Sequence, residues 1–266
     1  MQQKIVHRGP DGYGVWACEE KRIGFAHRRL SIQDLSDDAS QPFVSENKKI
    51  TLVFNGEIYN HPELKLKLEN LGYRYRTNCD TETLIHAYRE WGIDFLHKLD
   101  GMFSIALFDS EKDELFLIRD RIGIKPLYFS LQKNKLSFAS EIKALWPLPW
   151  MDKKISRLAS YHYYTFMVAP SPTTIFEGVY KLPAGFYCHV DANKNVNFKE
   201  WYSPINCLKT PVEKNYYDEQ FCVEGVQALI SDSVKKRMLA DVPVGAFLSG
   251  GLDSSLIEIG RASCRE

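Results

Sequence analysis

An apolar run near the C-terminal end leads directly into a glycine-rich turn, and this junction restricts the fold more than any other segment. Residues 244–248 are Val-Gly-Ala-Phe-Leu, and residues 249–255 are Ser-Gly-Gly-Leu-Asp-Ser-Ser. The pattern predicts a strand, a turn that gathers backbone N–H groups, and the N-terminus of a helix. Such a turn binds phosphate, so the segment indicates an α/β nucleotide-binding domain.

The charge balance excludes several classes of function. Lys and Arg number 34 and Asp and Glu also number 34, so the net charge is zero. This balance argues against nucleic acid or a membrane surface as a partner. The sequence has no long apolar span and no leader pattern, which favours a cytoplasmic protein.

The six cysteines do not form a metal-binding pattern. None of them belongs to a Cys-x-x-Cys pair, and no histidine cluster accompanies them. We therefore expect no structural metal and no disulfide framework, and reduced thiols suit the cytosol.

The first 200 residues are rich in predicted strands, separated by polar turns. Two helices are expected between them, at 61–71 and 80–91, the second capped by Asp80 or Thr81. The predicted strands cover residues 13–18, 22–26, 50–54, 102–108, 115–118, 127–131, 136–139 and 186–190.

The composition changes near Ser203, where two domains of different class are expected to meet. Residues 204–217 are polar, contain two prolines and suit a linker. A long helix is predicted from about Asp218 to Leu239, followed by the strand and phosphate turn. We therefore predict a first domain over 1–203 and the start of a second over 218–257.

Four polar clusters carry candidate chemistry, although each also has a plain structural explanation. Residues 7–12 resemble an ordinary turn, and Arg29 resembles a surface arginine, but an arginine can also hold a carboxylate through two hydrogen bonds. Asn55-Gly56 is a turn signal, yet an amide with a neighbouring N–H can stabilise an oxyanion. Asp80 is either a helix cap or a partner for a ligand ammonium group.

Taken together, these clusters resemble the class II glutamine amidotransferase domain of the glutamine-hydrolysing asparagine synthetase family. Residues 249–255 resemble the ATP pyrophosphatase loop of that family. The resemblance runs in order from His7 to about Ile257. It is carried by residues 7–11, 29–32, 55–60, 101–103, 119–128, 139–145, 172–178, 181–185 and 249–255.

The resemblance implies an α+β fold, the αββα sandwich of N-terminal-nucleophile hydrolases. A truncated α/β domain, similar to adenine-nucleotide hydrolases, would follow with its first helix, strand and phosphate loop. A cysteine at the first position of the mature chain would attack glutamine, with its own α-amine as base. Ammonia would pass to the second domain, where ATP and Mg²⁺ adenylate aspartate, and would displace AMP to give asparagine. The intact enzyme would be a homodimer.

The same resemblance implies roles for individual residues. Arg29 would hold the glutamine α-carboxylate within a binding segment made of Arg29, Leu30, Ser31, Ile32 and Gln33. Asn55 and Gly56 would form the oxyanion hole, and Glu57 and Asp80 would engage the α-ammonium group. ATP would bind to Leu248, Ser249, Gly250, Gly251, Asp253, Ser254 and Ser255.

The sequence departs from this family at both ends. The attacking cysteine is expected well before His7, so Met1 would be an internal or arbitrary first residue. Cys18 lies within a predicted strand, lacks a free α-amine and cannot replace it. Residues 259–266 are identical to one translated frame of a widely used sequencing adapter, so 258–266 are expected to be an artefact. The printed chain is therefore interpreted as an inactive fragment truncated at both ends.

Two alternatives remain open at this point. A related class II amidotransferase would act on another carboxylate, such as a β-lactam precursor, an exported polymer or a peptide. A non-catalytic glutamine-binding module would have lost its nucleophile, although the attached phosphate loop argues against a pure sensor.

Overall fold

The computed structural model describes residues 1–207 and 218–263. These divide into two compact units. The first contains residues 1–31 and 36–202, and the second contains residues 32–35 with the described residues that follow 202.

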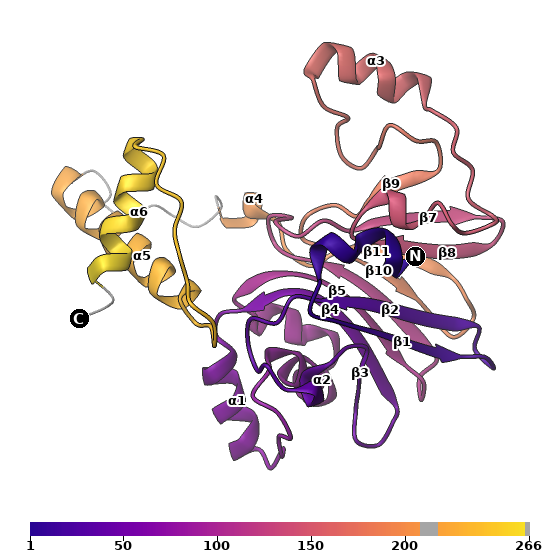
Figure 1. Ribbon diagram of the computed structural model, residues 1–266, viewed down its shortest axis with the longest axis horizontal. Helices are drawn as coiled ribbons and strands as arrows, with labels where there is room; N and C mark the ends of the chain where they lie inside the picture. The colour runs from indigo at the N-terminus through magenta and orange to yellow at the C-terminus, as the bar shows by residue number, and fades with distance from the viewer. Residues whose placement is uncertain (208–217, 264–266) are drawn as a thin grey trace. The chain divides into compact units, whose positions relative to one another are not determined.

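The first unit is built on a six-stranded sheet in which every neighbouring pair is antiparallel (Figure 1). Its strands, in spatial order, are β11 (Val196–Glu200), β10 (Phe186–Val190), β6 (Glu114–Arg119), β5 (Gly101–Asp109), β4 (Ile50–Ile58) and β3 (Phe43–Val44).

Two smaller antiparallel sheets belong to the same unit. β1 (Gly12–Cys18) pairs with β2 (Ile23–Arg29), and β7 (Tyr128–Gln132) pairs with both β8 (Lys135–Ala139) and β9 (Val179–Lys181). No ladder joins these two small sheets within the described residues.

Both faces of the large sheet are buried, because alternate side chains of β4 and β5 enter different cores. On one face, Leu52 and Ile105 pack with Leu68 of α1 (His61–Asn70) and Leu84 of α2 (Asp80–Trp91). On the other face, the core contains the following side chains from β2, β4, β5 and β7: Phe25, Val53, Ala106, Phe108 and Phe129. The result is a helix layer, the large sheet and a second β layer.

Short 3-10 helices pack against β8 and β9 in a further hydrophobic cluster. Ile5 of η1 (Gln2–Arg8) and Ala144 of η4 (Ile142–Ala144) pack there with Ala139 of β8. The helix–sheet–sheet–helix order predicted for the first domain is thus confirmed, with an outer helical layer of 3-10 rather than α geometry.

The eight strands and two helices predicted in this unit are all present, with ends that shift by up to four residues. The largest shift is in β4, which continues to Ile58, so the predicted turn at Asn55-Gly56 is wrong. Asn55 faces Ser104 and Gly56 faces Phe103 in the ladder with β5. Long-range pairing therefore overrides the local turn preference.

Several elements had no clear sequence signal. β3 and β9 contain only two and three residues. β11 pairs with β10, while α3 (Arg157–Phe166) buries only Ala159. The unit also contains η2 (Asp37–Ala39) and η3 (Gly92–Lys98).

The regular secondary structure described in the second unit is helical. α5 (Glu219–Arg237) begins after Asp218, whose carboxylate accepts the Phe221 N–H, as expected for the predicted helix. Its predicted apolar face is largely exposed, because Phe221, Val226 and Leu229 are 43%, 56% and 71% accessible. No described helix is both long and apolar enough to cross a membrane.

The strand predicted over residues 244–248 is not formed. A strand needs a neighbour to satisfy its backbone, and the described part of this unit contains no other strand. The turn and helix are confirmed, since Gly250 has φ +79° and α6 (Leu252–Ser263) follows.

Two sequence interpretations fall partly outside the description. Within the predicted linker, α4 (Pro204–Cys207) is helical, and residues 208–217 lie outside the described residues. Within the segment interpreted as an adapter, residues up to 263 continue α6, and residues 264–266 lie outside.

Candidate active site

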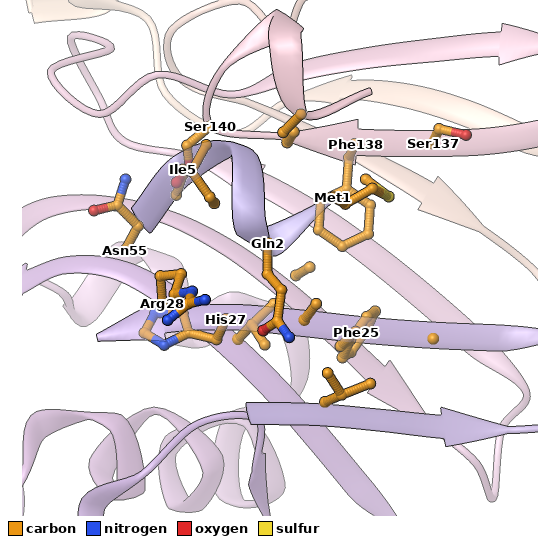
Figure 2. Close-up of a pocket in the computed structure, with 18 of the residues that line it drawn as sticks. Met1, Gln2, Ile5, Phe25, His27, Arg28, Asn55, Ser137, Phe138 and Ser140 are labelled. Carbon is orange, nitrogen blue, oxygen red and sulfur yellow. The ribbon is translucent and has the colours of Figure 1, made fainter. Parts of the chain in front are cut away.

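A cavity of about 440 Å³ lies in the first unit and is lined by consecutive residues of two strands that do not pair with each other. Residues 24–28 of β2 and 136–140, from β8 and its end, form facing walls. Figure 2 shows Asn55, His27 and Arg28 toward one end, and Phe25 and Phe138 toward the other. The end of the cavity that holds Asn55, His27 and Arg28 is termed the polar end.

Four buried polar atoms of residues lining this cavity have no hydrogen-bond partner. They are the Asn55 Nδ2, His27 Nδ1, Arg28 Nε and Gln2 Oε1 atoms. Buried polar groups are nearly always satisfied in folded proteins, so a cluster of unsatisfied ones indicates a site for a polar group. Asn55 brings an amide donor, as oxyanion stabilisation requires.

His27 connects β2 to β4 beside this polar end. Its Nε2 lies 3.1 Å from the Phe54 carbonyl oxygen, which only accepts hydrogen bonds, so Nε2 carries the proton. Burial lowers the pKa of His27 to about 4, and Arg29 adds to the lowering, while the Phe54 hydrogen bond opposes it. The imidazole is therefore neutral at pH 7, and Nδ1 is an acceptor. Sequence reasoning missed this residue, which lies two positions before Arg29.

The middle of β4 is held by contacts to Gln41 and to β5. Gln41 Oε1 accepts the Phe54 N–H at 2.6 Å, while Gln41 Nε2 donates to Thr81 Oγ1 at 3.3 Å. Gly56 is required by close packing, because a Cβ there would lie 2.0 Å from the Met102 carbonyl oxygen. Asn55 therefore lies on a strand that cannot shift easily.

Asp80 does not cap α2 as predicted. The N-cap is Cys79, without a side-chain cap bond, and Asp80 Oδ2 instead accepts the Ile58 N–H at 3.0 Å. Burial raises the pKa of Asp80 to about 7, and the negative charge of Glu57 adds to the rise, whereas the Ile58 hydrogen bond opposes it. The structure thus places the carboxylates of Glu57 and Asp80 within electrostatic reach of each other.

Lys125 balances part of this negative charge. Burial raises the pKa of Glu57, while the charge of Lys125 acts against that rise. Burial lowers the pKa of Lys125, and Glu57 opposes that lowering in turn. The sequence analysis included Lys125 only within a family-like segment and assigned it no role.

Asp120 and Arg119 build the loop that carries Lys125. The Asp120 carboxylate accepts the backbone N–H groups of Phe103, Ile122, Ile124 and Lys125. The Arg119 guanidinium donates to the carbonyl oxygens of Gly123, Lys125 and Leu182. These two side chains explain the polar composition of residues 119–125 by loop architecture.

Arg29 ends β2, two residues after His27. Its Nη1 donates to the Ser36 carbonyl at 2.8 Å. Leu30 is exposed, and the Ser31 N–H donates to Asp11 Oδ2 at 2.9 Å. Ile32 and Gln33 belong to the short segment grouped with the second unit.

An ionic cluster joins two of the family-like segments. Glu141 Oε1 lies 2.8 Å from His7 Nε2 and 3.3 Å from Arg8 Nη1, while Oε2 lies 2.9 Å from Lys143 Nζ. Burial raises the pKa of Glu141, but the hydrogen bonds from Lys143, His7 and Arg8 outweigh it and lower the pKa to about 2. The cluster connects η1 to the segment after β8, both of which line the cavity.

None of the described cysteines is among the residues that line the cavity. Cys18 ends β1, at the opposite end of the β1–β2 ladder from the Gly12–Arg29 pair. Cys79 and Cys188 are buried, and burial raises the pKa of each thiol. The described cysteines therefore provide no nucleophile for this site.

The glycine-rich turn of the second unit has backbone N–H groups and hydroxyls of the kind that bind phosphate. It precedes the 12-residue helix α6, whose N-terminal N–H groups suit an anion. The hydroxyls of Ser254 and Ser255 bind the Gly251 carbonyl at 3.0 and 2.9 Å, and Ser249 Oγ lies 2.9 Å from Ser254 Oγ. Leu248 and Asp253 are exposed. Among the described residues no group of three or more His, Cys, Asp or Glu side chains could hold a metal ion.

Comparison with known proteins identifies two matching families. Residues 1–202 match the family described as glutamine amidotransferase domain, and residues 225–260 match the family described as asparagine synthase. The chain is 37% identical to asparagine synthetase (glutamine-hydrolyzing) 2 of Bacillus subtilis strain 168, over 97% of this chain and 34% of that protein. It is also 37% identical to the putative asparagine synthetase (glutamine-hydrolyzing) 2 of Methanocaldococcus jannaschii, over 97% of this chain and 52% of that protein.

The fold is similar to that of a solved structure with low sequence identity. This is glutamine phosphoribosylpyrophosphate amidotransferase from B. subtilis, complexed with ADP and GMP. The TM-score is 0.54 at 16% identity, over 99% of this chain and 60% of that one. The printed chain spans about a third to a half of the two curated relatives. The family match over most of the sequence and the layered fold lead to one assignment: the chain belongs to the glutamine amidotransferase family, and a segment matching asparagine synthase follows that domain.

Proposed function

We propose that this chain is the glutamine-hydrolysing part, with the beginning of the ATP-dependent part, of a longer enzyme that makes asparagine. The observation that carries the proposal is the unpartnered Asn55 amide at the polar end of the cavity. The names of the curated relatives support asparagine as the product.

In this proposal the substrate is held by its two charged ends. Arg29 binds the glutamine α-carboxylate, and residues 30–33 complete that segment. Glu57 and Asp80 bind the α-ammonium group, and the burial of both carboxylates supports this pairing. The side-chain carbonyl oxygen points to the Asn55 amide and the Gly56 N–H.

The nucleophile in this proposal is the thiol of a cysteine with a free α-amine, on a strand that precedes the residues described here. The cavity supports it, because β2 and β8 present unpaired edges to a space lined along both strands. The sulfur bonds to the amide carbon, the thiol proton moves to the α-amine, and the carbonyl electron pair moves to the oxygen. Collapse expels ammonia with that proton, and water then hydrolyses the thioester to glutamate.

The phosphate turn would serve the second half-reaction. ATP phosphates would bind the N–H groups and hydroxyls of Ser249, Gly250, Gly251, Ser254 and Ser255, with Leu248 and Asp253 beside them. Bound ATP and its Mg²⁺ supply adenylation of aspartate with release of pyrophosphate, and ammonia displaces AMP. A homodimer in the cytoplasm is part of the same proposal.

Removing Arg29 from the full-length protein separates the two half-reactions. Arg29→Ala should raise KM for glutamine by about tenfold or more, since a bidentate charged contact is lost. Ammonia-dependent asparagine synthesis should be unchanged, and Cys18→Ala should alter neither activity. Loss of both activities in a folded Arg29→Ala protein, or glutaminase activity that depends on Cys18, would contradict the proposal.

A further inference from the structure

We propose that His27 is a positioning residue for glutamine hydrolysis, whose Nδ1 accepts an N–H from the α-amino group of the attacking residue. This inference rests on the proposed function, because it needs an amino-terminal nucleophile in the cavity. It assigns a role to a side chain that neither the motifs nor the family resemblance singled out.

A hydrogen bond fixes the orientation of the His27 ring. The Nε2–H donates to the carbonyl oxygen of Phe54, the residue directly before Asn55. This bond fixes the tautomer, and it also fixes which ring nitrogen remains as an acceptor. Nδ1 is fully buried and has no partner, although His27 lines the cavity.

The unpartnered polar atoms of the lining residues include both donors and acceptors. Asn55 Nδ2 and Arg28 Nε are unpartnered donors, which suit a carbonyl oxygen or an oxyanion. The unpartnered acceptors are His27 Nδ1 and Gln2 Oε1. The attacking residue carries its α-amine close to its thiol. When the thiol approaches a substrate held by Asn55, the amine can donate an N–H to His27, whose ring is held by the Phe54 carbonyl.

A hydrogen-bond acceptor at Nδ1 would fix the orientation of the amine. A primary amine has two N–H bonds and one lone pair, so holding one N–H limits the direction of the lone pair. The base that receives the thiol proton is then aimed before the reaction begins. A neutral acceptor also stabilises the protonated ammonium form, which raises the pKa of the amine.

The charged side chains in the cavity wall are all cationic and add no acceptor. The charged side chains that line it are Arg8 of η1, Arg22 before β2 and Arg28 of β2. Arg29 acts on His27 from the same strand, and Glu57 follows Asn55 by two residues on β4. The lining residues of β5 and β8, and Leu127 before β7, include no ionisable side chain.

Two substitutions of His27 in the full-length protein distinguish the hydrogen bond that Nε2–H donates to Phe54 from the one that Nδ1 would accept. In His27→Gln the side-chain amide reaches the position of Nε2 and can still donate to Phe54, but the acceptor at the Nδ1 position is lost. In His27→Asn the amide lies near the Nδ1 position and can accept, but it is too short for Phe54. His97→Gln is the matched control, because His97 is exposed on η3 and does not line the cavity.

The acceptor role makes His27→Gln the more damaging change for catalysis. We expect kcat for glutamine to fall about tenfold or more with KM within a factor of about two, as for loss of a general-base contribution. The acid limb of the kcat/KM profile should move to lower pH, because the amine loses the bond that stabilises its charged form. His27→Asn should regain part of kcat, and His97→Gln should match the unsubstituted protein.

Three results would overturn the inference. If His27→Gln raised KM with an unmoved acid limb, Nδ1 would bind the glutamine amide instead of the amine. If His27→Gln behaved normally while His27→Asn failed, His27 would be only a brace. A protonated Nδ1 in the ¹⁵N spectrum of the printed chain at pH 7 would remove the acceptor directly. Absence of glutaminase activity in the unsubstituted full-length protein would instead reject the proposed function.

Discussion

Asp80 combines two properties that usually conflict in a folded protein. Its carboxylate is 6% exposed and accepts a backbone N–H from Ile58, yet its charged form is disfavoured by burial and by Glu57. Ionisation of such a buried carboxyl group lowers the free energy of unfolding, and a bound cation stabilises the ionised form. The glutamine α-ammonium group in our proposal is such a cation.

Asp80→Asn is expected to stabilise the first unit at pH 8 and to weaken glutamine use. The folded-state pKa is raised from 3.8 to about 7, so the contribution of Asp80 to stability is complete below pH 3.8 and is lost as the pH rises through about 7. Asparagine keeps the acceptor for Ile58 and removes the charge. The free energy of unfolding at pH 8 should therefore rise by up to about 4 kcal/mol.

Urea denaturation of both proteins at pH 5 and pH 8 measures this effect. The unsubstituted chain should lose stability between the two pH values more steeply than Asp80→Asn does. In the full-length protein, KM for glutamine should rise in the variant while ammonia-dependent synthesis persists. Equal pH dependence of unfolding in both proteins would show that Asp80 does not carry this cost.

At the level of elements, β4 shows how a close backbone approach sets the length of a strand. Residues 55–58 have a turn-like local sequence, but they pair with Ser104 to Gly101 of β5. The pairing is possible because Gly56 leaves room for the Met102 carbonyl. The strand therefore carries Asn55 onto a rigid element, where a turn would have left it mobile.

Gly56→Ala tests this explanation. Its Cβ would lie 2.0 Å from a backbone oxygen in the middle of the sheet, so the backbone would have to shift. Overpacking of this kind should cost about 3 kcal/mol or more and misplace Asn55. Gly24→Ala in β2 is a matched control, since its Cβ would meet the Trp16 carbonyl oxygen at an ordinary 3.6 Å. Thermal unfolding of the two variants should differ clearly, and similar midpoints would contradict the steric argument.

At the level of the whole molecule, the two units differ in how much apolar surface they bury. The first unit contains three hydrophobic clusters, whereas α5 has no buried residue. Phe247, in the unformed strand, is fully exposed. A unit with so little burial has a small opening free energy.

Hydrogen exchange of the printed chain should therefore separate the two units. Amides of β4, β5 and α2 are expected to be protected for hours, because they open only with the first unit. Amides of residues 218–257 should exchange orders of magnitude faster, since local opening costs little there. Protection of residues 244–248 comparable to that of β5 would mean that this segment has found a sheet partner.

Periodic patterns predicted elements well where burial follows the local sequence. α1, α2 and α5 and most strands of the first unit were predicted because their side chains alternate or repeat with the period of the element. The segment 244–248 was predicted by the same logic and is not a strand, because an apolar run also needs a partner. Site residues were predicted from the sequence where the side-chain type and its neighbours indicate a role, as for Asn55, Glu57 and Asp80.

The sequence alone determined the family, the main helices and strands, and the chemical types available to the site, because these depend on local order and side-chain identity. Tertiary structure decided that Asn55 lies in a strand, that Asp80 binds Ile58 instead of capping α2, and that His27 offers a buried acceptor. Each of these depends on a contact between residues more than 20 positions apart. Such contacts follow from packing, which local patterns do not encode.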